Sequence, residues 1–80
     1  MSADQDSDIK TIYVHLLDEG TTVLRPTQGE SMGGGIYRLL PTPDYDADDE
    51  SWEFLPGTIV RCTTQISDGE EILVARESVA

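Results

Sequence analysis

Residues 59–66 constrain the fold of this chain more than any other segment. They read Ile-Val-Arg-Cys-Thr-Thr-Gln-Ile, and the run of β-branched residues favours an extended strand. The Asp-Gly pair at Asp68 and Gly69 is the favoured centre of a tight β-hairpin. We therefore predict that residues 59–66 and 71–77 pair as an antiparallel hairpin.

Shorter segments upstream carry similar signals. Ile12, Val14 and Leu16 share one parity, which predicts a strand with one covered face. No window has the period and caps of an amphipathic helix, although residues 44–52 have room for one helical turn. The expected strands are residues 10–17, 21–25, 36–40, 52–54, 59–66 and 71–77. Their spacing predicts an all-β fold, a small five- to six-stranded antiparallel barrel of the SH3-like or OB-like kind, because closure removes exposed edges.

Glycine and proline mark the expected breaks between these strands. Pro26 is expected to end the second strand, because proline cannot donate to a sheet ladder. Residues 27–35 contain four glycines and end in Gly-Gly-Gly, which predicts a flexible loop. Residues 18–20, Asp-Glu-Gly, predict the turn after the first strand.

The chain of 80 residues is long enough for one domain with a modest core. We predict a disordered acidic tail over residues 1–8 and a single β-barrel domain over residues 9–80. No apolar run approaches the roughly 20 residues of a membrane span, and the acidic start is unlike a signal peptide. Cys62 is the only cysteine, which excludes an intrachain disulfide and fits a cytoplasmic location.

Negative charge dominates the composition. The chain has 16 acidic and 5 basic residues, for a formal net charge of -11. Such a chain repels nucleic acid and anionic membranes, so we predict that it binds neither directly. The expected partner is a basic protein surface, including that of a protein whose natural ligand is a polyanion. We expect the chain itself to be a monomer or a weak dimer.

Carboxylates are concentrated between residues 44 and 53. Aromatic rings among carboxylates suit a basic partner, because arginines stack on rings and pair with acids. The alternative is that the acids only solvate a loop and the rings fill the core, which is the favoured interpretation for Phe54. The expected partner-binding residues are Asp44, Tyr45, Asp46, Asp48, Asp49, Glu50, Trp52 and Glu53, together with Asp18 and Glu19 of the first turn.

The same acidic segment does not match a calcium-binding loop of the EF-hand type. Asp49 stands where that loop needs glycine, and Leu55 stands where it needs glutamate. We therefore predict no metal ion and no cofactor.

The strand arginines allow two interpretations. Arg25, Arg38, Arg61 and Arg76 fall one to a strand. They either pair with nearby acids along the outer wall or form a patch for a carboxylate or phosphate ligand. The negative field of the chain favours pairing.

Catalytic motifs are not evident in the sequence. His15 and Cys62 are the only plausible base and nucleophile, and both fall within expected strands. A lone strand cysteine is usually a small core residue, and a lone histidine is usually a partly exposed one. We predict that the protein is not an enzyme.

The stretch Val-His-Leu-Leu-Asp-Glu-Gly-Thr-Thr-Val-Leu-Arg-Pro at residues 14–26 resembles a group of short uncharacterised bacterial proteins. The resemblance continues at residues 34–38, 52–57 and 60–62. In that group an aromatic residue often fills the place of Leu24. The resemblance supports the expected fold and brings no assigned activity.

These features predict a non-enzymatic acidic interaction module. One version is an inhibitor that mimics nucleic acid in a basic channel, as anti-CRISPR proteins do. The alternative is a structural or housekeeping barrel that binds through an apolar or edge-strand surface, with the charge serving solubility. A small-molecule or cation site in the barrel mouth is a third class.

Overall fold

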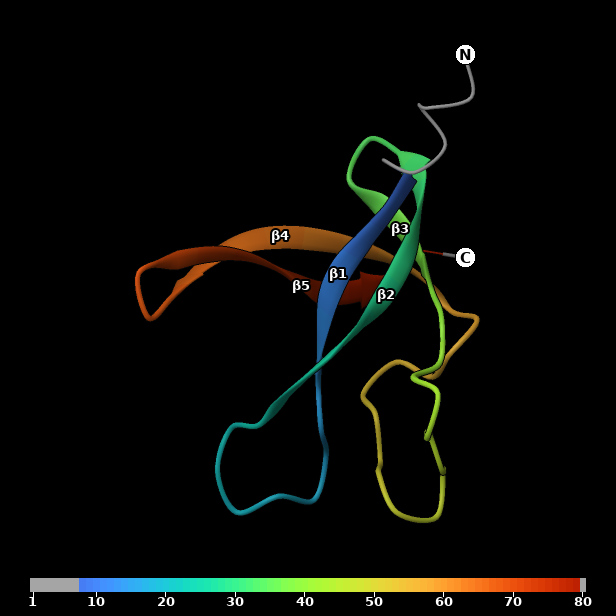
Figure 1. The fold of residues 1–80 in the computed structure, drawn as a ribbon, viewed down its shortest axis with the longest axis vertical. Helices are drawn as coiled ribbons and strands as arrows, with labels where there is room; N and C mark the ends of the chain where they lie inside the picture. Colours follow the sequence, from blue (N-terminus) through green and yellow to red (C-terminus); the bar gives the residue numbers. More distant parts are fainter. Residues whose placement is uncertain (1–7, 80) are drawn as a thin grey trace.

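Five strands form where the sequence alternates or is rich in β-branched residues. In the computed structural model, which describes residues 8–79, they close into a barrel (Figure 1). The strands are β1 (Ile9–His15), β2 (Leu24–Gly33), β3 (Ile36–Leu39), β4 (Ile59–Ser67) and β5 (Glu70–Ser78). The predicted tail, residues 1–8, lies outside the described residues except for Asp8. The predicted small all-β barrel is confirmed.

The strands follow one another around the barrel in chain order, without the crossover of a Greek key. Each pairs with the next in antiparallel orientation. The barrel closes between β1 and β5, and this ladder is parallel, with Ile12 opposite Leu73 and Tyr13 opposite Val74. The expectation of a wholly antiparallel barrel therefore needs correction at this one pairing.

The hairpin predicted from the Asp-Gly pair is confirmed. β4 and β5 pair from Ser67 and Glu70 at the turn to Val60 and Ser78 at the far end. Asp68 has a φ of 52° and Gly69 a φ of 83°, the two left-handed residues that a tight hairpin turn of this type requires. Local sequence thus determines this part of the fold.

The prediction for β2 was wrong. The strand does not end at Pro26 but runs on to Gly33, and Pro26 itself lies opposite Tyr13 of β1. On its other side β2 pairs with β3 only from Gly29 onward. Pro26 therefore lies on a stretch with one neighbouring strand, where a missing N–H is tolerated. The predicted loop over residues 27–35 shrinks to the turn around Gly34.

The predicted strand at residues 52–54 is also absent. Trp52 makes one isolated antiparallel bridge with Leu16, and no ladder develops from it. Residues 40–58 otherwise connect β3 to β4 as a long loop. Within residues 8–79, no helix is long and apolar enough to cross a membrane.

The core lies inside the barrel. On β1 it contains Ile12 and Val14, which share the alternation predicted from the sequence. The fully buried side chains are Ile12, Val14, Leu39, Val60 and Val74. Trp52, Cys62 and Ala75 join them at 3%, 8% and 1% exposure. Each enclosed aliphatic side chain contributes roughly 1.5–3 kcal/mol relative to an exposed one.

Gly29 lies in the middle of β2 because there is no room there for a side chain. A Cβ atom added to it would lie 2.6 Å from Cγ1 of Ile12, which is fully buried and cannot easily move. The glycine thus permits β2 to cross closely over the core.

We expect Gly29→Ala to lower the free energy of unfolding by about 1–3 kcal/mol, because it overpacks the core at Ile12. Gly20→Ala is the matched control, since nothing lies within 4 Å of its added Cβ. Urea unfolding of both variants measures the difference. Equal stability of the two variants would contradict the close approach.

Candidate functional site

Two loops lie together at one end of the barrel (Figure 1). One follows β1 and the other joins β3 to β4. The Leu17 N–H donates to the carbonyl of Ser51 at 2.6 Å, and the Glu53 N–H donates to the carbonyl of His15 at 2.9 Å. These bonds flank the bridge between Leu16 and Trp52, so segments distant in sequence are held side by side.

Trp52 fixes the longer loop to the core. Its side chain is buried, and the ring of Tyr45 stands edge-on to it with 4.8 Å between ring centroids. Edge-to-face pairs of this kind add about 0.5–1.5 kcal/mol beyond burial. Of the two aromatic residues expected to bind a partner, Trp52 is therefore enclosed and Tyr45 is half-buried.

Glu50 connects the same loop to β2. Its Oε1 accepts a hydrogen bond from Nε1 of Trp52 at 2.8 Å, and its Oε2 forms an ion pair with Arg25. Both oxygens are thus engaged within the chain. The structure gives Glu50 a role in positioning the loop, and its charge is compensated.

The remaining predicted acids are exposed. Glu53 lies 3.5 Å from Nδ1 of His15, measured from Oε1. Asp46 shapes its own turn, because its Oδ1 accepts the N–H of Asp48 at 2.9 Å. Six of the predicted acids are exposed and take part in none of the ion pairs found within residues 8–79, and we call this set the acidic end: Asp18, Glu19, Asp44, Asp46, Asp48 and Asp49. The other exposed acids outside these ion pairs are Asp8, Asp68, Glu70 and Glu71.

Three of the four strand arginines pair with carboxylates, as the sequence predicted. The pairs are Arg25 with Glu50, Arg38 with Glu30, and Arg61 with Glu77.

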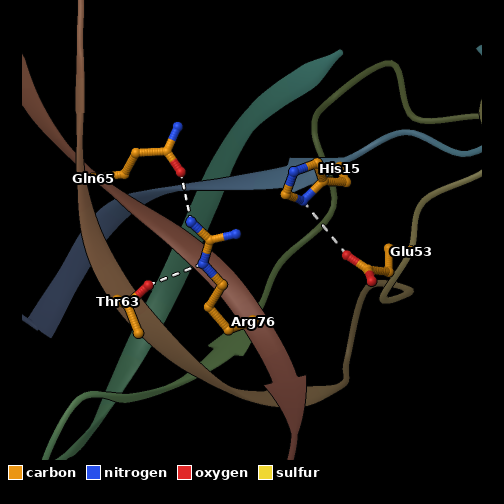
Figure 2. A network of polar contacts seen from close by, with 5 residues as sticks. All are labelled: His15, Glu53, Thr63, Gln65 and Arg76. Atoms are coloured by element: carbon orange, nitrogen blue, oxygen red, sulfur yellow. Dashed lines mark hydrogen bonds and ion pairs between the residues drawn. The ribbon is translucent and has the colours of Figure 1, made fainter. Parts of the chain in front are cut away.

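Arg76 differs from the other three. Its Nε donates to Oγ1 of Thr63 at 3.0 Å and its Nη2 donates to Oε1 of Gln65 at 2.5 Å (Figure 2). Both acceptors are neutral and lie on β4. No carboxylate within the described part of the chain pairs with this guanidinium.

A hollow of about 560 Å³ opens beside Arg76. Its walls are the loop after β1, Ala75 and Arg76 of β5, and the pair formed by His15 and Glu53. Figure 2 shows the Arg76 guanidinium on one side and the His15–Glu53 pair on the other. Sequence reasoning missed this site, because it depends on the parallel ladder that carries His15 of β1 alongside Arg76 of β5.

Comparison with known proteins gives no further assignment. No protein-family model matches the chain, and neither a curated protein nor a solved structure is significantly similar to it. The resemblance to short bacterial proteins stays a prediction. Within residues 8–79, no group of three or more His, Cys, Asp or Glu side chains is placed to hold a metal ion.

Cys62 is a core residue, as predicted for a lone strand cysteine. Burial raises the pKa of its thiol from 9.0 to about 11, because the thiolate is poorly solvated there. A thiol with a raised pKa is a weak nucleophile at neutral pH. His15 is half-buried, as expected.

The role of Glu50 predicts a difference between neighbouring acids. We expect Glu50→Gln to lower the free energy of unfolding by about 1 kcal/mol, since it removes the charge paired with Arg25. Asp49→Asn should leave it unchanged within about 0.5 kcal/mol. Urea unfolding measures both, and an equal loss in the two variants would argue against a positioning role.

The buried thiol predicts a pH dependence. The unfolded state releases the Cys62 proton at lower pH than the folded state does, so stability is lost as pH rises from about 9 to about 11. In Cys62→Ala this component of the loss should be missing. Unfolding curves for both proteins across that range provide the test, and identical pH profiles would show that the thiol does not contribute.

Proposed function

We propose that this protein is a non-enzymatic interaction module whose acidic end binds a basic protein surface. The observation that carries the proposal is the gathering of six exposed, uncompensated carboxylates from two loops at one end of the barrel. The arginines of the wall are largely neutralised by other acids. Of the ten exposed acids outside ion pairs within residues 8–79, six belong to the acidic end, so unpaired negative charge is concentrated there.

Electrostatics explains why such an end favours a cationic partner. Like charges held close together repel one another, and a basic surface relieves that repulsion when it docks. The attraction reaches about 8 Å at physiological ionic strength and accelerates encounter.

The positioning of the long loop strengthens this interpretation. Trp52 and Glu50 hold the loop before any partner arrives. Loops that are already ordered lose less entropy on binding, so more of the interaction energy appears as affinity.

In its finer form, the proposal is that the acidic end mimics nucleic acid and occupies the basic channel of a nucleic-acid-binding effector in the cytoplasm. Asp44, Asp46, Asp48 and Asp49 would stand in for successive phosphates. Inhibitors of the anti-CRISPR kind act by this physical principle, because they offer carboxylates where the effector expects a polyanion.

A second candidate function rests on the edge of β4. β3 pairs with β4 only from Ile59 to Arg61, so the segment beyond Cys62 has β5 as its one neighbour. The hairpin projects from the barrel (Figure 1), and Ile66 near its tip is 64% exposed. An open edge of this type can accept a strand from a partner, and such binding depends little on salt.

Two matched triple variants test the acidic end. The first changes Asp46, Asp48 and Asp49 to Asn, and the second changes Asp68 to Asn and Glu70 and Glu71 to Gln. Each removes three negative charges, but only the first touches the acidic end. We expect the first variant to lose at least about tenfold in affinity, and the second to lose less than about threefold.

The measurement begins with the unaltered chain immobilised in bacterial lysate at low salt, followed by mass identification of the captured proteins. The affinities of the wild type and both variants are then compared for a captured basic protein, at low and high salt. Binding that is unaffected by salt and by the first variant would refute the acidic end and favour the edge of β4. Capture that yields no basic protein would also refute it.

A further inference from the structure

We propose that the hollow beside Arg76 binds a basic α-amino acid. The carboxylate of the ligand lies on Arg76, and its cationic groups lie toward Glu53, Asp18 and Glu19. The inference goes beyond the proposed function, because it concerns a small molecule held by Arg76 and Glu53, and it shares only Asp18 and Glu19 with the acidic end.

Arg76 is already oriented for a carboxylate. A guanidinium has five N–H donors, and Thr63 and Gln65 take up two of them through Nε and Nη2. Three donors remain, two on Nη1 and one on Nη2, and a carboxylate can accept hydrogen bonds from them. Because Thr63 and Gln65 of β4 already hold the guanidinium in place, little side-chain entropy is lost when a ligand binds.

Residues 8–79 do not supply that carboxylate. The chain has 16 acidic and 5 basic residues, yet the acceptors at Arg76 are a hydroxyl and an amide. Arg25, Arg38 and Arg61 are all paired with glutamates. Arg76 thus remains available to an external carboxylate at the wall of this hollow.

The opposite side of the hollow carries the complementary charge. Glu53 lies within 3.5 Å of His15, and Asp18 and Glu19 line the loop side. The three carboxylates and one guanidinium of the lining sum to a charge of -2. A simple anion would be repelled by this field, whereas a ligand with one carboxylate and two cationic groups matches it.

The dimensions and apolar surfaces fit the same class of ligand. A volume of about 560 Å³ lies within the usual range of small-molecule sites, roughly 300–1,000 Å³. Leu16 and Leu17, which also line the hollow, provide apolar surface for the methylene chain of a lysine or arginine. The chemistry therefore selects a basic amino acid over an acidic or an apolar one.

Isothermal titration calorimetry on the full chain at pH 7 tests the proposal, with L-arginine and L-lysine as probes. Agmatine lacks the carboxylate of arginine, and L-citrulline lacks the side-chain charge. We expect each to bind at least about tenfold more weakly than L-arginine. No detectable heat with L-arginine or L-lysine at millimolar concentration, or equal binding of agmatine, would overturn the proposal.

Variants locate the contact. Arg76→Gln should lose at least about tenfold in affinity for L-arginine, and Arg61→Gln should bind as the wild type does, because Arg61 pairs with Glu77 outside the hollow. A thermal melt of each variant confirms that it is folded. Unchanged binding by folded Arg76→Gln would contradict the assigned contact, and the agmatine comparison decides the question if that variant does not fold.

The triple variant of Asp46, Asp48 and Asp49 separates this proposal from the proposed function. These residues do not line the hollow. We expect the variant to bind L-arginine normally while it loses the basic protein. Loss of amino-acid binding in this variant would contradict the hollow as an independent site.

Discussion

The arrangement of this molecule depends on the burial of Trp52 against the end of the barrel. The connection from β3 to β4 forms no strand of its own, so only a few interactions hold it in place. The bridge to Leu16, the hydrogen bond from Trp52 to Glu50 and the ion pair from Glu50 to Arg25 are the chief ones. Without these interactions, nothing would offset the conformational entropy that the loop loses when it is ordered.

The attachment of this loop through Trp52 and Glu50 also explains why the net charge of -11 is unevenly distributed over the surface. Glutamates neutralise three of the four wall arginines, while the aspartates of the long loop and the pair Asp18 and Glu19 lie on two loops that backbone hydrogen bonds hold together. Repulsion among those acids opposes folding, and the packing of Tyr45 against the buried Trp52 offsets it.

Local signals predicted β4, β5 and their turn, since β-branched residues and an Asp-Gly pair act over a few neighbours. Pro26 and Gly29 led to the wrong prediction for β2. Pro26 is tolerated because a neighbouring strand is missing there, and Gly29 is needed because Ile12 of the adjacent strand β1 leaves no room for a side chain. The parallel closure could not be predicted from local pattern. The acidic segment was visible in the sequence. The pairing of Glu50 with Arg25, twenty-five positions away, arises only from the tertiary fold. The same holds for the surroundings of Arg76.

The central claim is that the acidic end is the dominant cation-binding face of the molecule. The most direct measurement is an NMR titration of the ¹⁵N-labelled chain with a hexa-arginine peptide at low salt. The account predicts that the largest amide shifts fall at Asp18, Glu19 and residues 44–49, and that they collapse as salt is added. Largest shifts at the turn of the β4–β5 hairpin, or shifts spread evenly over all acids, would contradict it.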